Sequence, residues 1–302
     1  MRTSRLGAAL ALVLVATSPL AAAEVAILKS TDAPGWRPAL DALRKAIPTH
    51  TFSEYDLKGD RGEAERVLGT MKGRPVILVA LGPLAAQSAK ELLPDAPLVY
   101  CMIQDPSRLA LPPTASGVAF VVPVKNQLAA FRLVYPRGVR IGVIYGEESS
   151  GRLVQEAEKA AAVVRLAVIA RPVGSDKDVP QALRALLKGE DAVDALWIPP
   201  DPLLLGDETR RFLLSESLKA GKPVFSFSSA LVAEGALVSN GPDLPSVGEQ
   251  AGDIVNRLAA GDHTARGVTL VPRAELVINK KIADKLKIEI PPDALRAANK
   301  VI

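Results

Sequence analysis

Polar residues and glycines follow several of the short apolar runs in this chain, at the points where buried strands would end. In an open parallel sheet, ligands bind just outside the carboxyl ends of the strands, so these residues are the first candidates for chemistry. Their types include hydroxyls, carboxylates, an aromatic ring and a Gly-Pro pair. The candidate site residues are Ser30, Thr31, Gly82, Pro83, Asp105, Asp201, Phe227, Ser228 and Asp243.

Gly82-Pro83 suggests the most specific mechanism in this set. Glycine lets the backbone turn close to a ligand, and proline at the first helical position leaves the next amide groups pointing outward. A helix that starts in this way attracts a carboxylate or a phosphate. An ordinary strand-to-helix turn without a ligand would use the same two residues, so both interpretations stay open.

For two carboxylates and two aromatic rings, a purely structural role is the alternative to ligand binding. Asp105 precedes Pro106 and could bind an ammonium group in a cleft, but Asp-Pro is also common in turns. Asp201 stands between two prolines and belongs either to a turn or to a cleft. Trp36 and Phe227 follow strand ends, where each ring could stack on a ligand or pack between a helix and a loop.

The sequence patterns of the common catalytic sites are missing. The chain has no G-x-G-x-x-G, Walker, H-E-x-x-H or G-x-S-x-G motif, and its histidines are His50 and His263. Its one cysteine, Cys101, lies in an apolar run that predicts burial, so neither a disulfide nor a zinc site is expected. We predict no enzymatic activity, cofactor or metal. A secreted hydrolase that uses Asp105 or the Glu147-Glu148 pair is the alternative.

The elements that must position these residues alternate between short β-branched runs and helical patterns of about 10–15 residues, which is typical of βαβ units and a parallel sheet. The alternation begins at Val25 and starts again at Arg140, so the sequence predicts two similar α/β units. The expected strands span 25–28, 51–55, 76–80, 98–103, 117–121, 140–145, 166–171, 195–198, 224–227, 236–239, 268–270 and 276–278. The expected helices span 38–46, 62–71, 84–93, 125–135, 151–164, 179–188, 208–220 and 246–260.

Details of several of these elements bear on the arrangement of the site. Ser149 or Ser150 is the expected N-cap of helix 151–164, which leaves Glu147-Glu148 on a solvated loop. Tyr145 and Trp197 lie within expected strands and are predicted to be in the core. The amphipathic helix 246–260 could carry the chain back to the first unit, and the end of the chain is expected to be helical with an interruption.

Residues 1–23 have the layout of a secretory signal peptide. Arg2 and Arg5 form a basic start, residues 6–20 are almost wholly apolar, and Ala21-Ala22-Ala23 offers a cleavage site before Glu24. The apolar run is shorter than the ~20 residues of a membrane span, although a retained anchor is the alternative. No cysteine lies near the cleavage site, so no lipid anchor is predicted. Without residues 1–23, 35 basic residues face 33 acidic ones, which does not indicate a nucleic-acid surface.

Short motifs along the rest of the chain form an ordered series. They are Val79-Ala80-Leu81-Gly82, Pro97-Leu98-Val99, Asp105-Pro106, Gly117-Val118, Arg140 to Tyr145, Val193-Asp194-Ala195-Leu196, Pro223-Val224-Phe225, Gly235-Ala236-Leu237 and Leu276-Val277-Ile278-Asn279. In order and spacing this series resembles the ABC transporter substrate-binding family that includes tryptophan- and tyrosine-binding members. The resemblance covers nearly all of the chain after residue 23.

The resemblance implies an α/β fold of the type I periplasmic-binding-protein architecture: two doubly wound parallel-sheet lobes with three crossovers, which close on a ligand. The lobes would comprise 24–121 with 241–272, and 122–240 with 273–302. It places Ser30, Thr31, Gly82, the amides after Pro83, and Asp105 on one side of the cleft, and Asp201, Phe227, Ser228 and Asp243 on the other. By analogy, helix-start amides and hydroxyls would hold a carboxylate, while Asp105 or Asp201 would hold an ammonium group.

The function that the resemblance implies is solute capture for an importer. We expect a periplasmic monomer that binds a small polar ligand, with an amino acid or a related carboxylate as one candidate, and presents it to an inner-membrane ABC permease. A periplasmic sensor or adaptor that reports its ligand to a membrane receptor is the alternative. Ala80 stands where the family usually has threonine, and Gly146 to Ser150 replace its usual Asn-Pro turn, so the identity of the ligand stays open.

Overall fold

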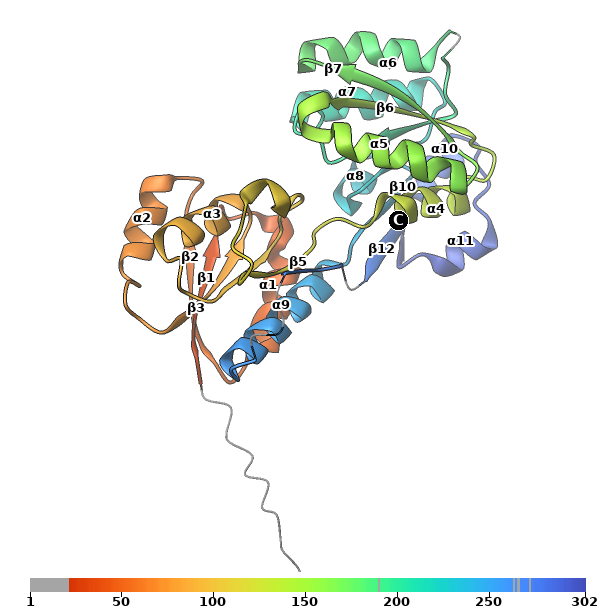
Figure 1. Cartoon of the computed structure of the whole chain (residues 1–302). Helices are drawn as coiled ribbons and strands as arrows, with labels where there is room; N and C mark the ends of the chain where they lie inside the picture. Colours follow the sequence, from red (N-terminus) through yellow and green to blue (C-terminus); the bar gives the residue numbers. More distant parts are fainter. Residues whose placement is uncertain (1–21, 190, 263, 265–266, 272) are drawn as a thin grey trace, which may run out of the picture.

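The computed structural model describes residues 22–189, 191–262, 264, 267–271 and 273–302. Most of the predicted signal peptide, and His263, lie outside the described residues. The described chain forms two α/β lobes, each built around its own sheet, which lie side by side and are joined by extended segments (Figure 1). Within the described residues, no helix is both long enough and apolar enough to cross a membrane.

The sheet of the N-terminal lobe is six-stranded, in the order β11-β5-β4-β3-β1-β2, and its neighbouring strands are all parallel. Its strands are β1 (Glu24–Lys29), β2 (Thr51–Asp56), β3 (Val76–Leu81), β4 (Leu98–Cys101), β5 (Ser116–Val118) and β11 (Gly267–Thr269). Its helices are α1 (Arg37–Ala46), α2 (Arg61–Gly69), α3 (Pro83–Leu92) and α9 (Leu244–Ala259), with the 3-10 turns η1 (Pro34–Trp36) and η2 (Pro106–Leu109).

The sheet of the C-terminal lobe is seven-stranded, in the order β13-β12-β10-β9-β8-β6-β7, and only the β10–β12 pair is antiparallel in the described chain. Its strands are β6 (Arg140–Gly146), β7 (Ala167–Val173), β8 (Ala195–Ile198), β9 (Val224–Ser226), β10 (Val238–Pro242), β12 (Ala274–Ile278) and β13 (Lys300–Val301). Its helices are α4 (Val124–Val134), α5 (Glu147–Val163), α6 (Val179–Leu187), α7 (Asp207–Lys219), α8 (Ser229–Glu234), α10 (Lys280–Lys285) and α11 (Pro292–Ala297), with the 3-10 turn η3 (Asp176–Asp178).

Both sheets are covered on their two faces, which is why their central strands are apolar throughout. In β3 all six residues are buried. Val79 and Leu81 pack in the cluster that contains α1 and α9, whereas Leu78 and Ala80 pack in the cluster that contains α2 and α3. The sequence therefore correctly predicted an α/β fold with parallel sheets.

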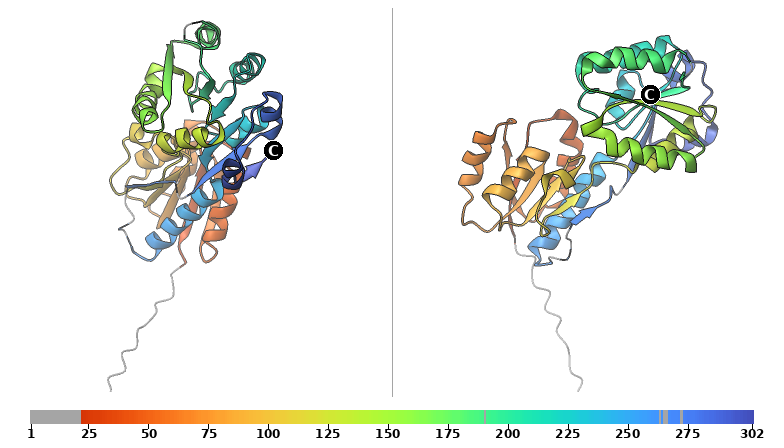
Figure 2. Two further views of the ribbon diagram at one scale, coloured as in Figure 1. Left: turned by 90° about the vertical axis from the view of Figure 1, so that its right-hand side faces the viewer. Right: turned by 45° about the horizontal axis from the view of Figure 1, so that its top comes forward.

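The chain passes between the two sheets at three places in the order of elements: from β5 to α4, from β10 to α9, and from β11 to β12. The expected three crossovers are thus confirmed. The second crossing leads into α9, which returns to the N-terminal lobe and packs beside α1 (Figure 2). The exact lobe boundaries stay a prediction.

Close packing of α9 on α1 depends on two glycines four residues apart. A Cβ atom on Gly248 would lie 1.9 Å from the backbone oxygen of Ala39, and one on Gly252 would lie 2.4 Å from the Cβ of Ala46. Since real Cβ atoms do not approach other atoms so closely, larger side chains there would push the helices apart. The returning helix thereby becomes part of the N-terminal core.

The core of the C-terminal lobe contains the two aromatic residues that the sequence placed there. Trp197 is fully buried and Tyr145 is 9% exposed, so both predictions are confirmed. The ring of Trp197 stacks on Phe225 with 6.0 Å between the centroids. Cys101 is also buried, as predicted, and burial raises the pKa of its thiol to about 12.

One element differs from its prediction in a way that changes the site. Helix α5 begins at Glu147 with Gly146 as N-cap, so the expected start at residue 151 and the expected loop over Glu147-Glu148 are wrong. A contact from elsewhere in the chain holds this start: Asp201 accepts hydrogen bonds from the N-cap amide, Gly146 N, and from Ser149 Oγ, while no side chain caps the helix locally. The acidic pair then lies in the first turn, where negative charge is favourable.

Smaller differences concern strand ends. β4 ends at Cys101 rather than at 103, β5 ends at Val118 rather than at 121, and β9 ends at Ser226 rather than at 227. β10 is shifted to Val238–Pro242. The apolar residues beyond these ends stay buried or half-buried, for example Ile103 at 4% exposure, which explains why they look like strand in the sequence.

Candidate ligand-binding cleft

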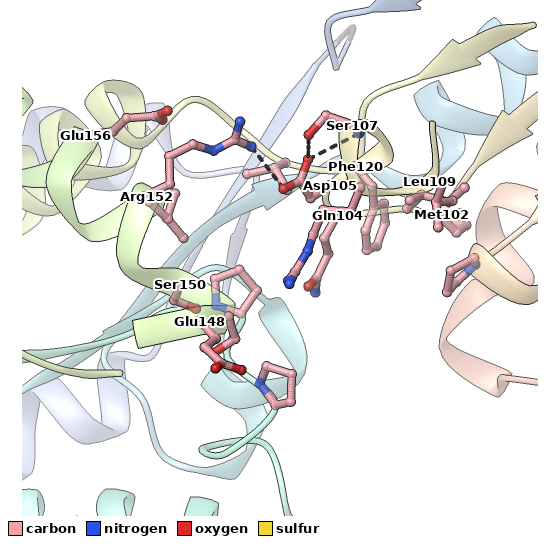
Figure 3. Close-up of a pocket in the computed structure, with 18 of the residues that line it drawn as sticks. Met102, Gln104, Asp105, Ser107, Leu109, Phe120, Glu148, Ser150, Arg152 and Glu156 are labelled. Carbon is pink, nitrogen blue, oxygen red and sulfur yellow. Dashed lines mark hydrogen bonds and ion pairs between the residues drawn. The ribbon is translucent and has the colours of Figure 1, made fainter. Parts of the chain in front are cut away.

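A cleft of about 890 Å³ lies between the two lobes, and both lobes line it (Figure 3). From the N-terminal lobe and the segment that follows β5, the lining residues are Trp36, Pro83, Met102, Ile103, Gln104, Asp105, Ser107, Arg108, Leu109, Phe120 and Val121. From the C-terminal lobe they are Glu148, Ser149, Ser150, Arg152, Leu153, Glu156, Pro200 and Pro202. We call these two sets the N-wall and the C-wall.

The N-wall carries most of the apolar surface. Met102 and Ile103, directly after β4, are each 4% exposed, and their side chains pack into the two clusters on opposite faces of the sheet. Trp36 and Phe120 are half-buried against the α1–α9 cluster. The apolar part of a ligand would therefore face a wall that is held rigidly by the core of the lobe.

Gly82, at the start of α3, allows Trp36 to take its place in this wall. The backbone of Gly82 has a φ of +87°, which lies in the left-handed region that favours glycine. In addition, a Cβ atom at this position would lie 2.8 Å from the ring of Trp36 and 2.7 Å from Ser30 Oγ. Pro83 follows at the first helical position, as the sequence predicted, and lines the cleft. Gly82 itself is buried behind the tryptophan ring.

Ser30 and Thr31 are placed differently from Pro83. Ser30 is buried, and its hydroxyl accepts a hydrogen bond of 2.9 Å from Ala85 N, so it caps the start of α3. That bond occupies one of the amides that were predicted to meet a ligand carboxylate. Thr31 is exposed. Neither residue belongs to the described lining of the cleft, and ligand binding by either stays a prediction.

Asp105 lines the cleft and connects the two walls. Its Oδ1 accepts hydrogen bonds from both Ser107 N and Ser107 Oγ, the turn geometry expected of Asp-Pro. Its Oδ2 accepts a hydrogen bond of 3.0 Å from Arg152 Nη2, across the cleft (Figure 3). The two interpretations of Asp105, as a turn residue and as a cleft residue, are therefore compatible.

The C-wall is built mainly from the first turns of α5. Glu148, Arg152 and Glu156 follow one another at intervals of four residues, which places them on one helix face. Ser150 is 3% exposed and also lines the cleft. In contrast to the N-wall, this wall presents mostly charged and hydroxyl groups.

Asp201 holds the C-wall in place from behind. It is fully buried, and its carboxylate accepts hydrogen bonds from Gly146 N (2.8 Å), Ser149 Oγ (2.7 Å) and Leu203 N (2.9 Å). Its neighbours Pro200 and Pro202 line the cleft, but Asp201 does not. The structure thus gives Asp201 a positioning role, and contact with a ligand stays a prediction.

The remaining candidates of the C-terminal half lie outside the described lining. Phe227 packs against the cluster on the α6–α7 side of the sheet, and Ser228 Oγ accepts a hydrogen bond from Ala230 N at the start of α8. Asp243, at the start of α9, forms an ion pair with Arg273. Their predicted roles in binding are not tested by these contacts.

Several residues of the cleft were not singled out from the sequence: Ser107, Arg108, Phe120, Arg152 and Glu156. The spacing Glu148-x₃-Arg152-x₃-Glu156 could have indicated a charged helix face if the start of α5 had been placed correctly. In the described chain, no group of three or more histidine, cysteine, aspartate or glutamate side chains could hold a metal ion.

Comparisons with known proteins agree with this architecture. A family model described as ABC transporter substrate binding protein matches residues 25–302. A domain solved in complex with L-Trp from Streptococcus pneumonia is 22% identical, with a TM-score of 0.72 over 93% of this chain and 100% of that one. A ligand-free, open substrate-binding protein with adhesive properties from Clostridium difficile is 19% identical, with a TM-score of 0.78 over 93% and 99%.

A more distant structure has the same fold. The periplasmic ribose ABC transporter protein from Conexibacter woesei is 11% identical, with a TM-score of 0.59 over 89% of this chain and 95% of that one. At these identities the structural likenesses show the type I periplasmic-binding-protein fold. A search of curated proteins gave no match.

Proposed function

The chain belongs to the ABC transporter substrate-binding family, and from this premise we propose that it is the extracytoplasmic solute-binding component of an ABC importer. It would capture a small polar solute in the cleft between its lobes and present it to a membrane permease. The observation that carries this proposal is the cleft itself: it has the volume of a small-molecule site and is lined by both lobes.

Closure of the lobes would couple binding to presentation. A solute that touches both walls stabilises the closed arrangement by its extra contacts there, because a ligand shifts an equilibrium only through its differential affinity for the two states. Near the first crossing, Gln127 Nε2 donates to Val122 O at 2.8 Å, and Asn240 Nδ2 donates to Asn126 O at 3.2 Å. The first bond braces the end of the crossing segment against α4, and the second ties α4 to β10 within the C-terminal lobe, so the hinge would lie on the N-terminal side of Val122.

An amino acid or a related carboxylate is the proposed solute class. The L-Trp complex of the structural neighbour supports an amino acid, and the combination of an apolar N-wall with a charged C-wall suits a molecule with an apolar side chain and charged groups. We further propose a cleaved signal peptide, a periplasmic location and a monomeric state. The sensor or adaptor alternative would use the same cleft.

Thermal shift with a broad solute panel tests the proposal. At 100 times its Kd, a ligand specific for the folded state adds about 2.7 kcal/mol, which for a protein of this size raises Tm by roughly 5–10 °C. Native mass spectrometry of the freshly purified protein would identify a retained solute. A panel of amino acids, carboxylates, nucleobases and sugars without any stabilisation, together with turnover of a substrate, would contradict the proposal.

A further inference from the structure

Arg152 joins the charged face of the C-wall to Asp105 on the N-wall. The guanidinium lies in the second turn of α5, its side chain is 68% exposed, and its Nη2 is 3.0 Å from Asp105 Oδ2 (Figure 3). Ion pairs this exposed contribute little to stability because water solvates both partners well. This interlobe ion pair is therefore easily replaced by a better partner.

The position of Asp105 does not depend on Arg152, so a cationic group of a ligand can take the place of Arg152 at Oδ2. Oδ1 is held by Ser107 N and Ser107 Oγ, so the carboxylate stays in position whether or not Arg152 is bound to Oδ2. If a ligand drew Arg152 away, Asp105 would still present Oδ2 to the cleft. That oxygen would then accept a hydrogen bond from a cationic group of the same ligand.

Arg152 is equally suited to a ligand carboxylate. The ion pair with Asp105 involves a single guanidinium nitrogen, whereas a guanidinium can hold a carboxylate through two parallel N–H bonds. A bidentate carboxylate would thus be a stronger partner than Asp105.

The charges around Arg152 limit what the ligand can carry. Glu148 and Glu156 lie one turn before and one turn after it on α5, and both line the cleft. Together with Asp105 they outnumber the two arginines of the lining, Arg108 and Arg152. A second negative charge on the ligand would meet these carboxylates, whereas an ammonium group would be attracted to them.

Taking the solute to be the amino acid proposed above, we propose that Arg152 is the residue that binds its carboxylate and determines specificity, and that the Arg152–Asp105 ion pair occupies the site until the solute separates it. The solute carboxylate then pairs with Arg152 while its ammonium group pairs with Asp105 Oδ2. This inference rests on the proposed function, since it assigns the chemistry of the same cleft.

The test compares matched ligands and variants by isothermal titration calorimetry. The probes are L-leucine, L-methionine, L-phenylalanine and L-tryptophan, each with its carboxamide, and L-glutamate as the dianionic comparison. We expect at least one apolar free acid to bind wild type about 10- to 100-fold more tightly than its carboxamide. In Arg152→Gln this preference should fall to within about threefold. L-glutamate should bind more weakly than the apolar acid.

Two further variants make the test specific. Arg211→Gln removes an equally exposed arginine on α7, outside the cleft, and should leave every affinity unchanged. Asp105→Asn should weaken binding of the zwitterion but strengthen binding of its deaminated acid, for example 3-phenylpropionate, because that acid no longer competes with Asp105 for Arg152.

The outcomes separate this inference from the proposed function. Undiminished preference for the free acid in Arg152→Gln, or weaker binding of the deaminated acid in Asp105→Asn, overturns the inference. So does binding of a sugar or another uncharged solute with no binding of any free amino acid, although the proposed function would then stand. Failure of every solute in the broad panel, together with turnover of a substrate, would instead contradict the proposed function.

Discussion

The two walls of the cleft differ in the interactions that hold them in position. The N-wall is an extension of the apolar core, since Met102 and Ile103 each reach into one of the two clusters of its lobe. The C-wall is the start of a helix whose position depends on a buried carboxylate, Asp201, in the next loop. The C-wall also has apolar packing behind it, because Val154, Ala157 and Ala161 of α5 are buried in the core of the C-terminal lobe. The difference between the walls is that the first turn of α5 depends in addition on the hydrogen bonds to Asp201.

This difference has a consequence for the effect of substitutions. Dispersion and hydrophobic contacts are numerous and individually weak, so the loss of one side chain from the N-wall leaves the others in place. The hydrogen bonds to Asp201 have no substitute, because removal of the carboxylate leaves buried amides without acceptors. We therefore expect the C-wall to be sensitive to substitution of Asp201, a residue that does not have to contact the ligand.

The largest effect should follow from Asp201→Ala. The substitution leaves Gly146 N, which is buried, and Leu203 N, which is half-buried, without their acceptor. An unsatisfied buried group costs about 1–3 kcal/mol and a half-buried one less, so a total of roughly 2–5 kcal/mol is expected. Urea unfolding followed by circular dichroism measures the shift of the midpoint. Asp201→Asn, which keeps one acceptor oxygen, should lose clearly less. Equal midpoints for wild type and Asp201→Ala would show that the carboxylate does not hold α5.

A smaller effect is expected from Gly82→Ala on the N-wall. The new Cβ would meet Ser30 Oγ at 2.7 Å and the ring of Trp36 at 2.8 Å, and the φ of +87° is strained for alanine, so a loss of about 1–3 kcal/mol is expected. Differential scanning calorimetry would report it. Gly35→Ala is the matched control, since a Cβ there meets nothing within 4 Å. A Tm for Gly82→Ala that matches this control would refute the close packing.

The difference between the N-wall and the C-wall also explains how much of the fold and of the cleft could be predicted from the sequence. The structure of the N-wall is determined by residues close together in the sequence. Gly82-Pro83 predicts a strand-to-helix turn, and Asp105-Pro106 predicts a turn after a strand. Both Pro83 and Asp105 line the cleft at the predicted edge of the sheet. The alternation of β-branched and helical segments likewise identified the α/β fold, because burial between two helical layers leaves a pattern in each strand.

The C-wall could not be predicted in the same way because its determinant is not local. Asp201 is 55 residues from Gly146 along the chain, and its hydrogen bonds move the start of α5 back to Glu147. Without that contact Ser149 and Ser150 are the natural caps, so Glu148 falls outside the expected helix and the spacing Glu148-x₃-Arg152-x₃-Glu156 does not appear as one helix face. Residues that reach the cleft from a helix face, rather than from a strand end, were missed for this reason.

A spectroscopic difference between the walls should accompany ligand binding. Trp36 is half-buried in the N-wall, whereas Trp197 is fully buried in the C-terminal core. We expect solute binding to change tryptophan fluorescence, because solvent is excluded from the indole of Trp36. Trp197→Phe should keep the change and Trp36→Phe should lose it. A change that persists in Trp36→Phe would place the solute away from the N-wall.

The smallest effect concerns Cys101, at the end of β4 directly before the N-wall. Burial raises the pKa of its thiol from the ordinary value to about 12, so in the folded protein the unreactive thiol form persists where an unfolded chain already forms thiolate. This contribution to stability is complete below the unfolded pKa, near 8.5, and is lost as pH rises toward 12. Alkylation by iodoacetamide at pH 8 should therefore be slow in buffer and rapid in urea. Since the thiol is part of the core beneath the N-wall, its labelling rate reports opening of the N-terminal lobe. A solute that contacts both walls should slow this labelling, whereas a solute held only by the C-wall would leave it unchanged.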